Sequence, residues 1–373
     1  MTEIPLDYDK IIAKDRLKAF ELIKAFADGT AKLALHLMKN YRWNVFNVTF
    51  TSTDRLQHFY WADEAILKNH YIWLDSILCK LLNLATSENA DVLIMSDHGF
   101  APIYKSINVN TILAKEGFMH IRSSRFESIL RSIGLHVEDI TNLFEWLNML
   151  PIASKLIPNS LKQSLPSRYT QKAEKPIAKL ETTAGIFIDK HACNDYEAVR
   201  NNIQRLLLAL GGDKRVFSGV YKREEVLWGP CVTRAPDIIV VPTEGYYVST
   251  AISDNIFEEP VQPISGIRRM GDHSTQGIFA AYGPNIKKGY KLNLDLQTWD
   301  IAPTLLHMLG LPIPDYMDGR VSKEIFREGT LPNMRPVKLQ KCGELDEARG
   351  AMVEGTLKEK EEIEKRLKSL GYL

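Results

Sequence analysis

Residues 91–100 constrain the fold of this 373-residue chain more than any other stretch. They read Asp-Val-Leu-Ile-Met-Ser-Asp-His-Gly-Phe. Four consecutive apolar residues that end at a turn signal predict a strand buried on both faces of a sheet. Asp97 and His98 follow that strand directly, at the edge where open α/β sheets place their ligands. The stretch therefore predicts an α/β protein with polar groups at the end of a central strand.

Asp97 and His98 have the chemistry of a metal-ligand pair. A carboxylate oxygen next to an imidazole nitrogen suits zinc or manganese. Taken alone, a polar turn after a strand explains the same two residues equally well. Further polar clusters decide between the two interpretations.

A second cluster follows a predicted strand at residues 43–51. Asp54 and His58 are four residues apart, so on a helical turn their side chains lie on one face. A capped helix with a surface histidine is the commoner explanation of such a pair by itself. The pair gains weight because it also stands where a strand ends.

The third cluster contains His273, on a predicted loop just before a predicted strand at residues 277–282. A single loop histidine carries little information. Three clusters that each lie beside the end of a strand indicate one shared site. The candidate metal ligands are Asp54, His58, Asp97, His98 and His273.

Composition excludes several classes of partner. The 47 basic and 46 acidic residues give a formal net charge of +1, which does not favour a nucleic acid. No run reaches the roughly 18 apolar residues that a membrane span needs. The four cysteines are scattered without a CxxC pair, and the N-terminus lacks the order of a signal peptide. These features predict a cytoplasmic protein.

The patterns along the chain predict three parts. Residues 1–122 and 181–340 alternate helical and strand patterns and form the expected catalytic domain. Residues 123–180 are basic and contain prolines, which predicts an inserted helical cap. The basic run is more often a solvated face than a phosphate clamp. Residues 341–373 are charged with a helical spacing and predict a C-terminal helix.

Taken together, the motifs resemble the alkaline phosphatase superfamily, and within it the type I phosphodiesterase/nucleotide pyrophosphatase family, with prokaryotic, archaeal-like members the most similar. The resemblance covers about residues 10–373. It rests on an ordered set of short motifs, which are Asp-Arg-Leu-Gln-His-Phe-Tyr-Trp at 54–61, Ser-Asp-His-Gly at 96–99, His273 with Gly277 and Gly283-Pro284, Asp-Ile-Ala-Pro-Thr-Leu-Leu-His at 300–307, Gly-Leu-Pro-Ile-Pro at 310–314 with Met-Asp-Gly-Arg at 317–320, and Leu-Lys-Ser-Leu-Gly-Tyr-Leu at 367–373.

The resemblance implies a three-layer α/β sandwich with a mostly parallel sheet and an inserted helical cap. It implies a metal-dependent phosphodiester or phosphate-ester hydrolase that acts on a small phosphate ester or nucleotide-type substrate. Two divalent metal ions are expected, with zinc favoured over manganese. By analogy, Asp54, His58 and His273 would hold one ion, and Asp97 with His98 would hold the other.

One part of the family pattern has no counterpart in this sequence. Family members begin with a strand that ends in a metal-binding Asp, followed by a Thr or Ser nucleophile. The fifty residues before Asp54 show no such strand and turn. We therefore expect an N-terminally incomplete enzyme with no catalytic nucleophile of its own and one well-held metal. We correspondingly expect that a partner chain supplies the missing N-terminal segment.

Two alternatives to an impaired hydrolase remain. The first is a non-catalytic remnant, or the subunit of a split enzyme. The second is another reaction of the superfamily, such as sulfate-ester hydrolysis or phosphoglycerate mutation. None of the four cysteines lies in a Cys-x-Pro-x-Arg motif, which weighs against a sulfatase.

Overall fold

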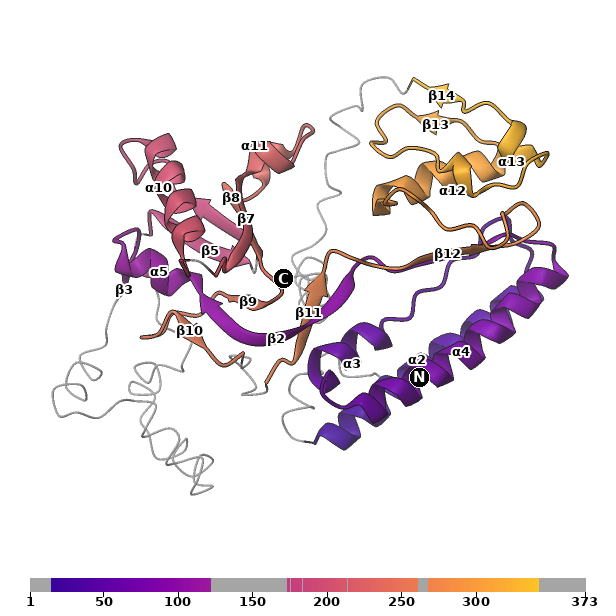
Figure 1. Ribbon diagram of the computed structural model, residues 1–373, viewed down its shortest axis with the longest axis horizontal. Helices are drawn as coiled ribbons and strands as arrows, with labels where there is room; N and C mark the ends of the chain where they lie inside the picture. Colours follow the sequence, from indigo (N-terminus) through magenta and orange to yellow (C-terminus); the bar gives the residue numbers. More distant parts are fainter. Residues whose placement is uncertain are drawn as a thin grey trace, which may run out of the picture. The chain divides into compact units, whose positions relative to one another are not determined.

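A computed structural model describes residues 15–121, 173–174, 176–182, 184–212, 214–260 and 268–341. The chain divides into two compact units (Figure 1). The first unit is Met1–Ala101 with Gly271–Leu373, and the second is Pro102–Met270. This division differs from the expected domain boundaries, which remain a prediction. The expected cap at 123–180 lies mostly outside the described residues, and the expected helix at 341–373 lies almost wholly outside them.

Helices and strands both occur through the described residues, with short 3-10 turns between some of them. The helices are α2 (Arg16–Asn40), α3 (Ser52–Tyr60), α4 (Glu64–Ser87), α5 (Val109–Lys115), α10 (Tyr196–Ala209), α11 (Arg223–Val226), α12 (Ile301–Leu309) and α13 (Leu331–Met334). The strands are β1 (Val92–Met95), β2 (Gly99–Asn108), β3 (His120–Ile121), β4 (Ala173–Glu174), β5 (Ala178–Thr182), β6 (Gly185–Ile188), β7 (Phe217–Lys222), β8 (Ile238–Pro242), β9 (Gly245–Ser249), β10 (Phe257–Glu258), β11 (Gly271–Ser274), β12 (Phe279–Tyr282), β13 (Ile313–Pro314) and β14 (Leu339–Gln340).

The long helices of the first unit agree with the sequence patterns. Asp15 and Asp63 cap α2 and α4 by accepting hydrogen bonds from the first-turn backbone, as N-cap carboxylates do. Helix α2 continues unbroken past Gly29. The two helices pack through small and branched side chains, namely Ala31 and Ala34 against Ile77 and Leu81. The described helices include none long and apolar enough to cross a bilayer.

The prediction of a strand at residues 43–51 is wrong, because these residues form no strand. Their side chains nevertheless alternate between buried and exposed, as they do in a strand. Phe46, Val48 and Phe50 alternate inward and pack on the core between α2 and α4. Figure 1 shows this segment as the coil that joins α2 to α3. Residues 44–49 exchange no backbone hydrogen bond with another described residue. The segment is extended, but without a neighbour it forms no ladder.

Strand β1 confirms the prediction for residues 92–95 but is less buried than expected. It pairs with β12 in antiparallel register, from Val92 opposite Tyr282 to Met95 opposite Phe279. Met95 is 40% exposed, and the sheet has two strands. The prediction of burial on both faces is therefore wrong, because Val92, Leu93 and Ile94 are half-buried and Met95 is exposed.

The second unit is built on a four-stranded sheet in the order β5-β6-β8-β7, and all its pairings are antiparallel. Helix α10 contributes Ile203 and Leu207 to the core of this unit. Strands β6 and β8 and helix α10 agree with the alternation of helical and strand patterns predicted for residues 181–340. Residues 243–260 contain the short strands β9 and β10.

The α/β class is confirmed, but the described strands do not form a mostly parallel sheet. Among the pairings with assigned register, β2–β9 and β13–β14 are parallel and the others are antiparallel. The β5–β6 connection shows why. A hairpin turn joins consecutive strands in the antiparallel sense, whereas a parallel pair needs a long crossover.

Helix α12 places His307 in a structural role. Gly310 ends the helix in the left-handed conformation with φ 76°, the usual glycine C-cap. His307 is buried, and its Nε2 bonds the carbonyl oxygen of Pro332 at 2.7 Å. This histidine packs the C-terminal part of the first unit and lies outside the site described below.

Candidate metal centre

Helix α3 supplies two of the predicted ligands. Asp54 lies in its first turn and His58 in its last turn, four residues apart on one face. The Oδ1 atom of Asp54 lies 3.4 Å from Nε2 of His58. The spacing seen in the sequence therefore does place both side chains at one point.

Both ends of α3 are anchored to neighbouring helices. At its start, the buried Ser52 hydroxyl lies 2.9 Å from Nε2 of His70 on α4. At its end, the Tyr60 hydroxyl donates to the carbonyl of Arg16, whose guanidinium donates to the carbonyl of Phe59. These contacts fix the helix, and so they fix the direction in which Asp54 and His58 point.

His273 reaches the same point from a distant part of the sequence. Its Nε2 lies 3.0 Å from Oδ1 of Asp54 and 3.2 Å from Nε2 of His58. The residue belongs to strand β11, so the expectation that it lies on a loop is wrong. A strand position restricts its backbone, which favours a fixed ligand direction.

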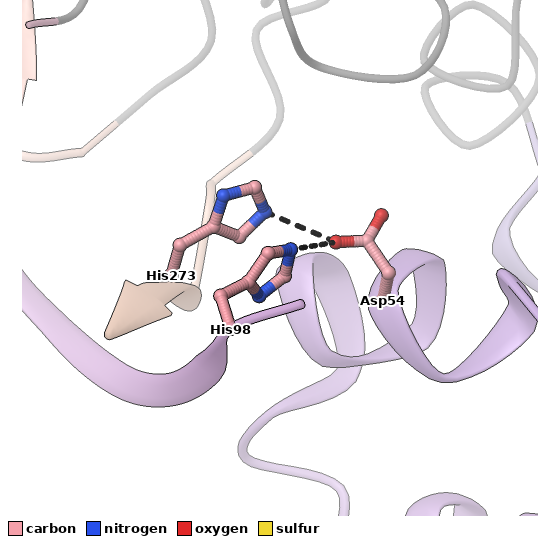
Figure 2. Close-up of side chains that lie close together, drawn as sticks. All are labelled: Asp54, His98 and His273. Atoms are coloured by element: carbon pink, nitrogen blue, oxygen red, sulfur yellow. Dashed lines mark hydrogen bonds and ion pairs between the residues drawn. The ribbon is translucent and has the colours of Figure 1, made fainter. Parts of the chain in front are cut away.

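His98 completes the group, and Asp97 lies at its margin. The Nε2 of His98 is 3.8 Å from Oδ1 of Asp54, and its ring stacks on that of His273 with centroids 3.6 Å apart. Figure 2 shows both imidazoles directed toward the Asp54 carboxylate. Asp97 has a side chain that is 64% exposed, with Oδ1 at 3.6 Å from Nε2 of His98.

Backbone carbonyls set the tautomers of two of the histidines. The Nδ1 of His58 lies 2.9 Å from the carbonyl oxygen of Gly271, and the Nδ1 of His98 lies 3.0 Å from that of Gly99. A carbonyl can only accept, so each Nδ1 carries the proton. Each Nε2 then faces the Asp54 carboxylate, to which it donates a hydrogen bond when the ring is protonated, and it offers its lone pair to a metal when the ring is neutral. Metal-binding histidines are commonly oriented by such a bond on the opposite nitrogen.

The distances between the candidate ligand atoms lie at or slightly below the edges of a metal-coordination tetrahedron. Zinc ligands at about 2.0–2.2 Å from the ion lie about 3.3–3.6 Å from one another in a tetrahedral site. The Oδ1 atom of Asp54 lies 3.4 Å from Nε2 of His58 and 3.0 Å from Nε2 of His273, and the two Nε2 atoms lie 3.2 Å apart. Three donor atoms of suitable type therefore fit a divalent metal, and a tetrahedron would leave its fourth position for water or substrate.

The cluster is also electrostatically suited to a cation. Burial alone would raise the pKa of Asp54, but hydrogen bonds from His273 and His58 outweigh burial and hold it far below its usual range. The carboxylate therefore stays ionised. It faces the Nε2 atoms of His58 and His273, which lie 3.2 Å apart. Their lone pairs would repel one another unless a proton or a metal ion lay between them.

Sequence reasoning missed two neighbours of this group. Asp272 offers a carboxylate within ligand distance of His58 and His273, and its Oδ1 is 4.0 Å from the Nδ1 of His58. The ring of Phe100 packs against His58 and His273, with centroids at 4.8 and 5.2 Å. The adjacency of Asp272 to His273 was a usable signal, whereas the contact of Phe100 appears only in the fold.

Comparison with known proteins decides the family. A model described as type I phosphodiesterase/nucleotide pyrophosphatase matches residues 7–276. The chain belongs to this family. No match is found among the curated proteins.

Solved structures similar to this member of the type I phosphodiesterase/nucleotide pyrophosphatase family have low sequence identity. Human ectonucleotide pyrophosphatase/phosphodiesterase 5 is 15% identical, with a TM-score of 0.44, over 81% of this chain and 64% of its own. Phosphonoacetate hydrolase from Sinorhizobium meliloti 1021 is 15% identical, with a TM-score of 0.39, over 69% and 50%. A mutant of alkaline phosphatase PafA is 16% identical, with a TM-score of 0.38, over 74% and 46%. The chain thus spans less than two thirds of the length of each.

Proposed function

We propose that this chain is the metal-binding part of a phosphodiester or phosphate-ester hydrolase. Membership of the type I phosphodiesterase/nucleotide pyrophosphatase family supports the reaction class. The observation that carries the proposal is the meeting of Oδ1 of Asp54 with Nε2 of His58 and His273 within 3.4 Å. Zinc is the favoured ion, with manganese second, because the donors are imidazole nitrogens and a carboxylate.

Asp54, His58 and His273 would hold the first ion. Asp97 and His98 would contribute to a second and weaker site, because two ligands are fewer than a well-held ion requires. When bound, the ions would supply Lewis acidity toward a phosphoryl oxygen and charge neutralisation of the phosphate. Asp54 would remain ionised to hold the cation, and the Gly271 and Gly99 carbonyls would keep His58 and His98 turned toward it. The substrate class is a small phosphate ester or nucleotide.

The proposal includes impaired turnover by the chain alone. Neither a Thr or Ser nucleophile nor the Asp expected before it was found in the sequence ahead of Asp54. Loss of a covalent nucleophile commonly costs several orders of magnitude in rate. The competing proposal is a non-catalytic remnant, or the subunit of a split enzyme that receives the nucleophile from a partner chain.

The test is hydrolysis of bis-(p-nitrophenyl) phosphate by residues 1–373, together with elemental analysis after dialysis. We expect nearer one metal per chain than two, with slow hydrolysis that a chelator abolishes. The matched variants are His58→Ala, which should lose metal and activity, and His36→Ala, an exposed histidine of α2 that should keep both. A chain that keeps no zinc or manganese would refute the metal centre. Fast turnover would show that the chain contains a nucleophile.

A further inference from the structure

A pocket of about 350 Å³ lies against strand β12 of the first unit, which is labelled in Figure 1. We call it the β12 pocket. Its apolar lining includes Phe279, Ile286, Leu292 and Ile325. All residues that line it belong to the described stretch 268–341, and none belongs to the metal cluster. Its volume is within the range of small-molecule sites, about 300–1,000 Å³.

The apolar part of the β12 pocket is built on a fixed wall. Ile286 and Ile325 are buried and form one cluster with Phe326, against which Phe279 and Leu292 pack. An antiparallel bridge joins Ile286 to Phe326, and the backbone N–H that follows Ile286 donates to the carbonyl of Ile325 at 2.9 Å. The wall therefore presents carbon to a ligand and is ordered before binding, which lowers the entropic cost of binding an apolar group.

Two lysines supply the positive charge of the lining, namely Lys287 and Lys291. The Nζ of Lys287 lies 4.8 Å from the centroid of the Tyr290 ring, in a cation–π contact, and its side chain is half-buried. Within the described part of the chain, neither ammonium group has a hydrogen bond or an ion pair with another residue. Two cations beside apolar surface and without a counter-ion favour an anion.

The acidic residue Glu324 does not neutralise this charge. Its carboxylate forms an ion pair with Arg320, with a distance of 2.7 Å between the charged atoms. Contact with Arg320 is the main reason that the pKa of Glu324 is lowered, and the contribution of Lys287 is smaller. No acidic residue is among those that line the pocket. The charge of Lys287 is therefore available to a ligand.

We propose that the β12 pocket binds a small amphipathic anion. The apolar body of the ligand packs on Phe279, Leu292 and Ile325, and its carboxylate or phosphate head accepts hydrogen bonds from Lys287 and Lys291. An inorganic anion lacks the body, and a neutral alcohol lacks the charge. The proposal goes beyond the hydrolase function and does not depend on it, since the pocket shares no residue with the metal cluster.

The first experiment measures binding of radiolabelled octanoate to residues 1–373 by equilibrium dialysis, below the micelle concentration of the ligand. Acetate carries the head alone and 1-octanol the body alone. Each should compete at least about tenfold less well than unlabelled octanoate, because the site uses both parts. Octyl phosphate tests the second head group. If it competes at lower concentrations than octanoate, the ligand is a phosphate ester, and if at higher concentrations, a carboxylate.

The lysines offer a matched pair of variants. Lys287→Met removes a charge that lines the pocket and keeps an unbranched apolar side chain. Lys288→Met removes the neighbouring charge, which is exposed and outside the lining. We expect Lys287→Met to weaken octanoate binding at least about fivefold, and Lys288→Met to change it by less than about twofold. Equal effects of the two variants would indicate a diffuse charge effect and would overturn the proposal.

A site-specific measurement accompanies the dialysis. Acetylation by acetic anhydride, followed by mass spectrometry, reports how accessible each lysine is. Saturating octanoate should slow the acetylation of Lys287 and Lys291 and leave that of Lys288 unchanged. The proposal is overturned if protection is the same at all three lysines. It is also overturned if octanoate binding does not saturate, or if 1-octanol competes as well as octanoate.

Zinc content, measured on the wild type and both variants, separates this proposal from the metal centre. It should be equal in the three proteins, because neither lysine belongs to the metal cluster. Zinc retained without octanoate binding would overturn the ligand site and leave the metal centre standing. Octanoate binding without zinc would do the reverse.

Discussion

His58 and His273, which are 215 residues apart in the sequence, bring their Nε2 atoms to 3.2 Å from one another. The Nδ1 of His58 is occupied by the Gly271 carbonyl, so its Nε2 lone pair faces His273. Two such nitrogens at this distance require a proton or a cation with them. The adjacent Asp54 carboxylate favours a cation, and this relationship is the basis of the first prediction.

His273→Ala should lower zinc affinity. Disturbing the partners that orient metal ligands costs about 10–100-fold in affinity, so loss of a ligand itself should cost at least that much. The measurement is zinc binding by competition with a chromophoric chelator at pH 7.5. The control is His36→Ala, which removes an exposed histidine of α2 in the same unit. Unchanged affinity in His273→Ala would count against its role as a ligand.

Gly99→Ala should damage both stability and the metal centre. A Cβ at this position would lie 1.8 Å from the carbonyl oxygen of Gln276, which is backbone and has to move. Overpacking of this kind costs about 1–3 kcal/mol, and the shift would displace the carbonyl that orients His98. The measurements are urea unfolding and zinc affinity.

Gly29→Ala is the matched control for that change. A Cβ at Gly29, within α2, meets nothing within 4 Å. Alanine is the better helix former, so this variant should gain about 0.5–1 kcal/mol in free energy of unfolding and keep its zinc affinity. If both glycine variants behaved alike, the close approach of Gly99 and Gln276 would be wrong.

His70→Ala should destabilise the first unit and loosen the start of α3. It leaves the buried Ser52 hydroxyl without its partner, which costs about 1–3 kcal/mol, with a further loss from the cavity. Urea unfolding at pH 8 measures this loss, and His36→Ala again serves as the control.

The pH dependence of the same variant gives a second test. Burial lowers the pKa of His70 below its usual value, because the charged ring is poorly solvated. A depressed folded-state pKa gives stability that is present above about pH 6.5 and lost as the pH falls toward the folded-state pKa. The wild type should therefore lose more stability than His70→Ala between pH 7 and pH 5. Parallel stability curves for the two proteins would contradict the buried neutral histidine.

Tyr196→Phe tests the buried ionic group of the second unit. The Tyr196 hydroxyl donates to Asp237, which also accepts from Arg223 at 2.7 Å and from the backbone N–H of Ile188 at 2.7 Å. Removing one of three donors to a buried carboxylate should cost about 1–3 kcal/mol. Tyr104→Phe, at a position 66% exposed, is the control and should be nearly neutral.

Alkaline titration checks the environment of Tyr196. Burial and the hydrogen bond to Asp237 raise the pKa of Tyr196 to about 12. Stability from this group is fully present below about pH 10 and is lost as the pH rises through 12. Absorbance at 295 nm should therefore show a late-ionising tyrosine in the wild type that is missing in Tyr196→Phe. A complete titration near pH 10 would contradict the predicted environment.

The sequence by itself determined the local elements and the identity of the candidate ligands. Val92–Met95 reads as a strand because its apolar run is ended by Ser-Asp-His-Gly, and the strand is there. The Asp15 and Asp63 caps of α2 and α4 and the Gly310 C-cap of α12 are likewise local signals. Asp54 and His58 share a helix face because a spacing of four residues fixes their direction. These are short-range properties, which a pattern of neighbouring residues contains.

Tertiary structure alone decided which elements pair and which ligand atoms meet. Residues 43–51 alternate as a strand does, yet they form no ladder, because hydrogen bonding needs a neighbour that composition does not reveal. The orientation of His58 depends on the Gly271 carbonyl, which is brought there from 213 residues away. Asp272 and Phe100 join the cluster for the same reason. Contacts between distant segments depend on how the chain packs, and a local pattern does not encode that packing.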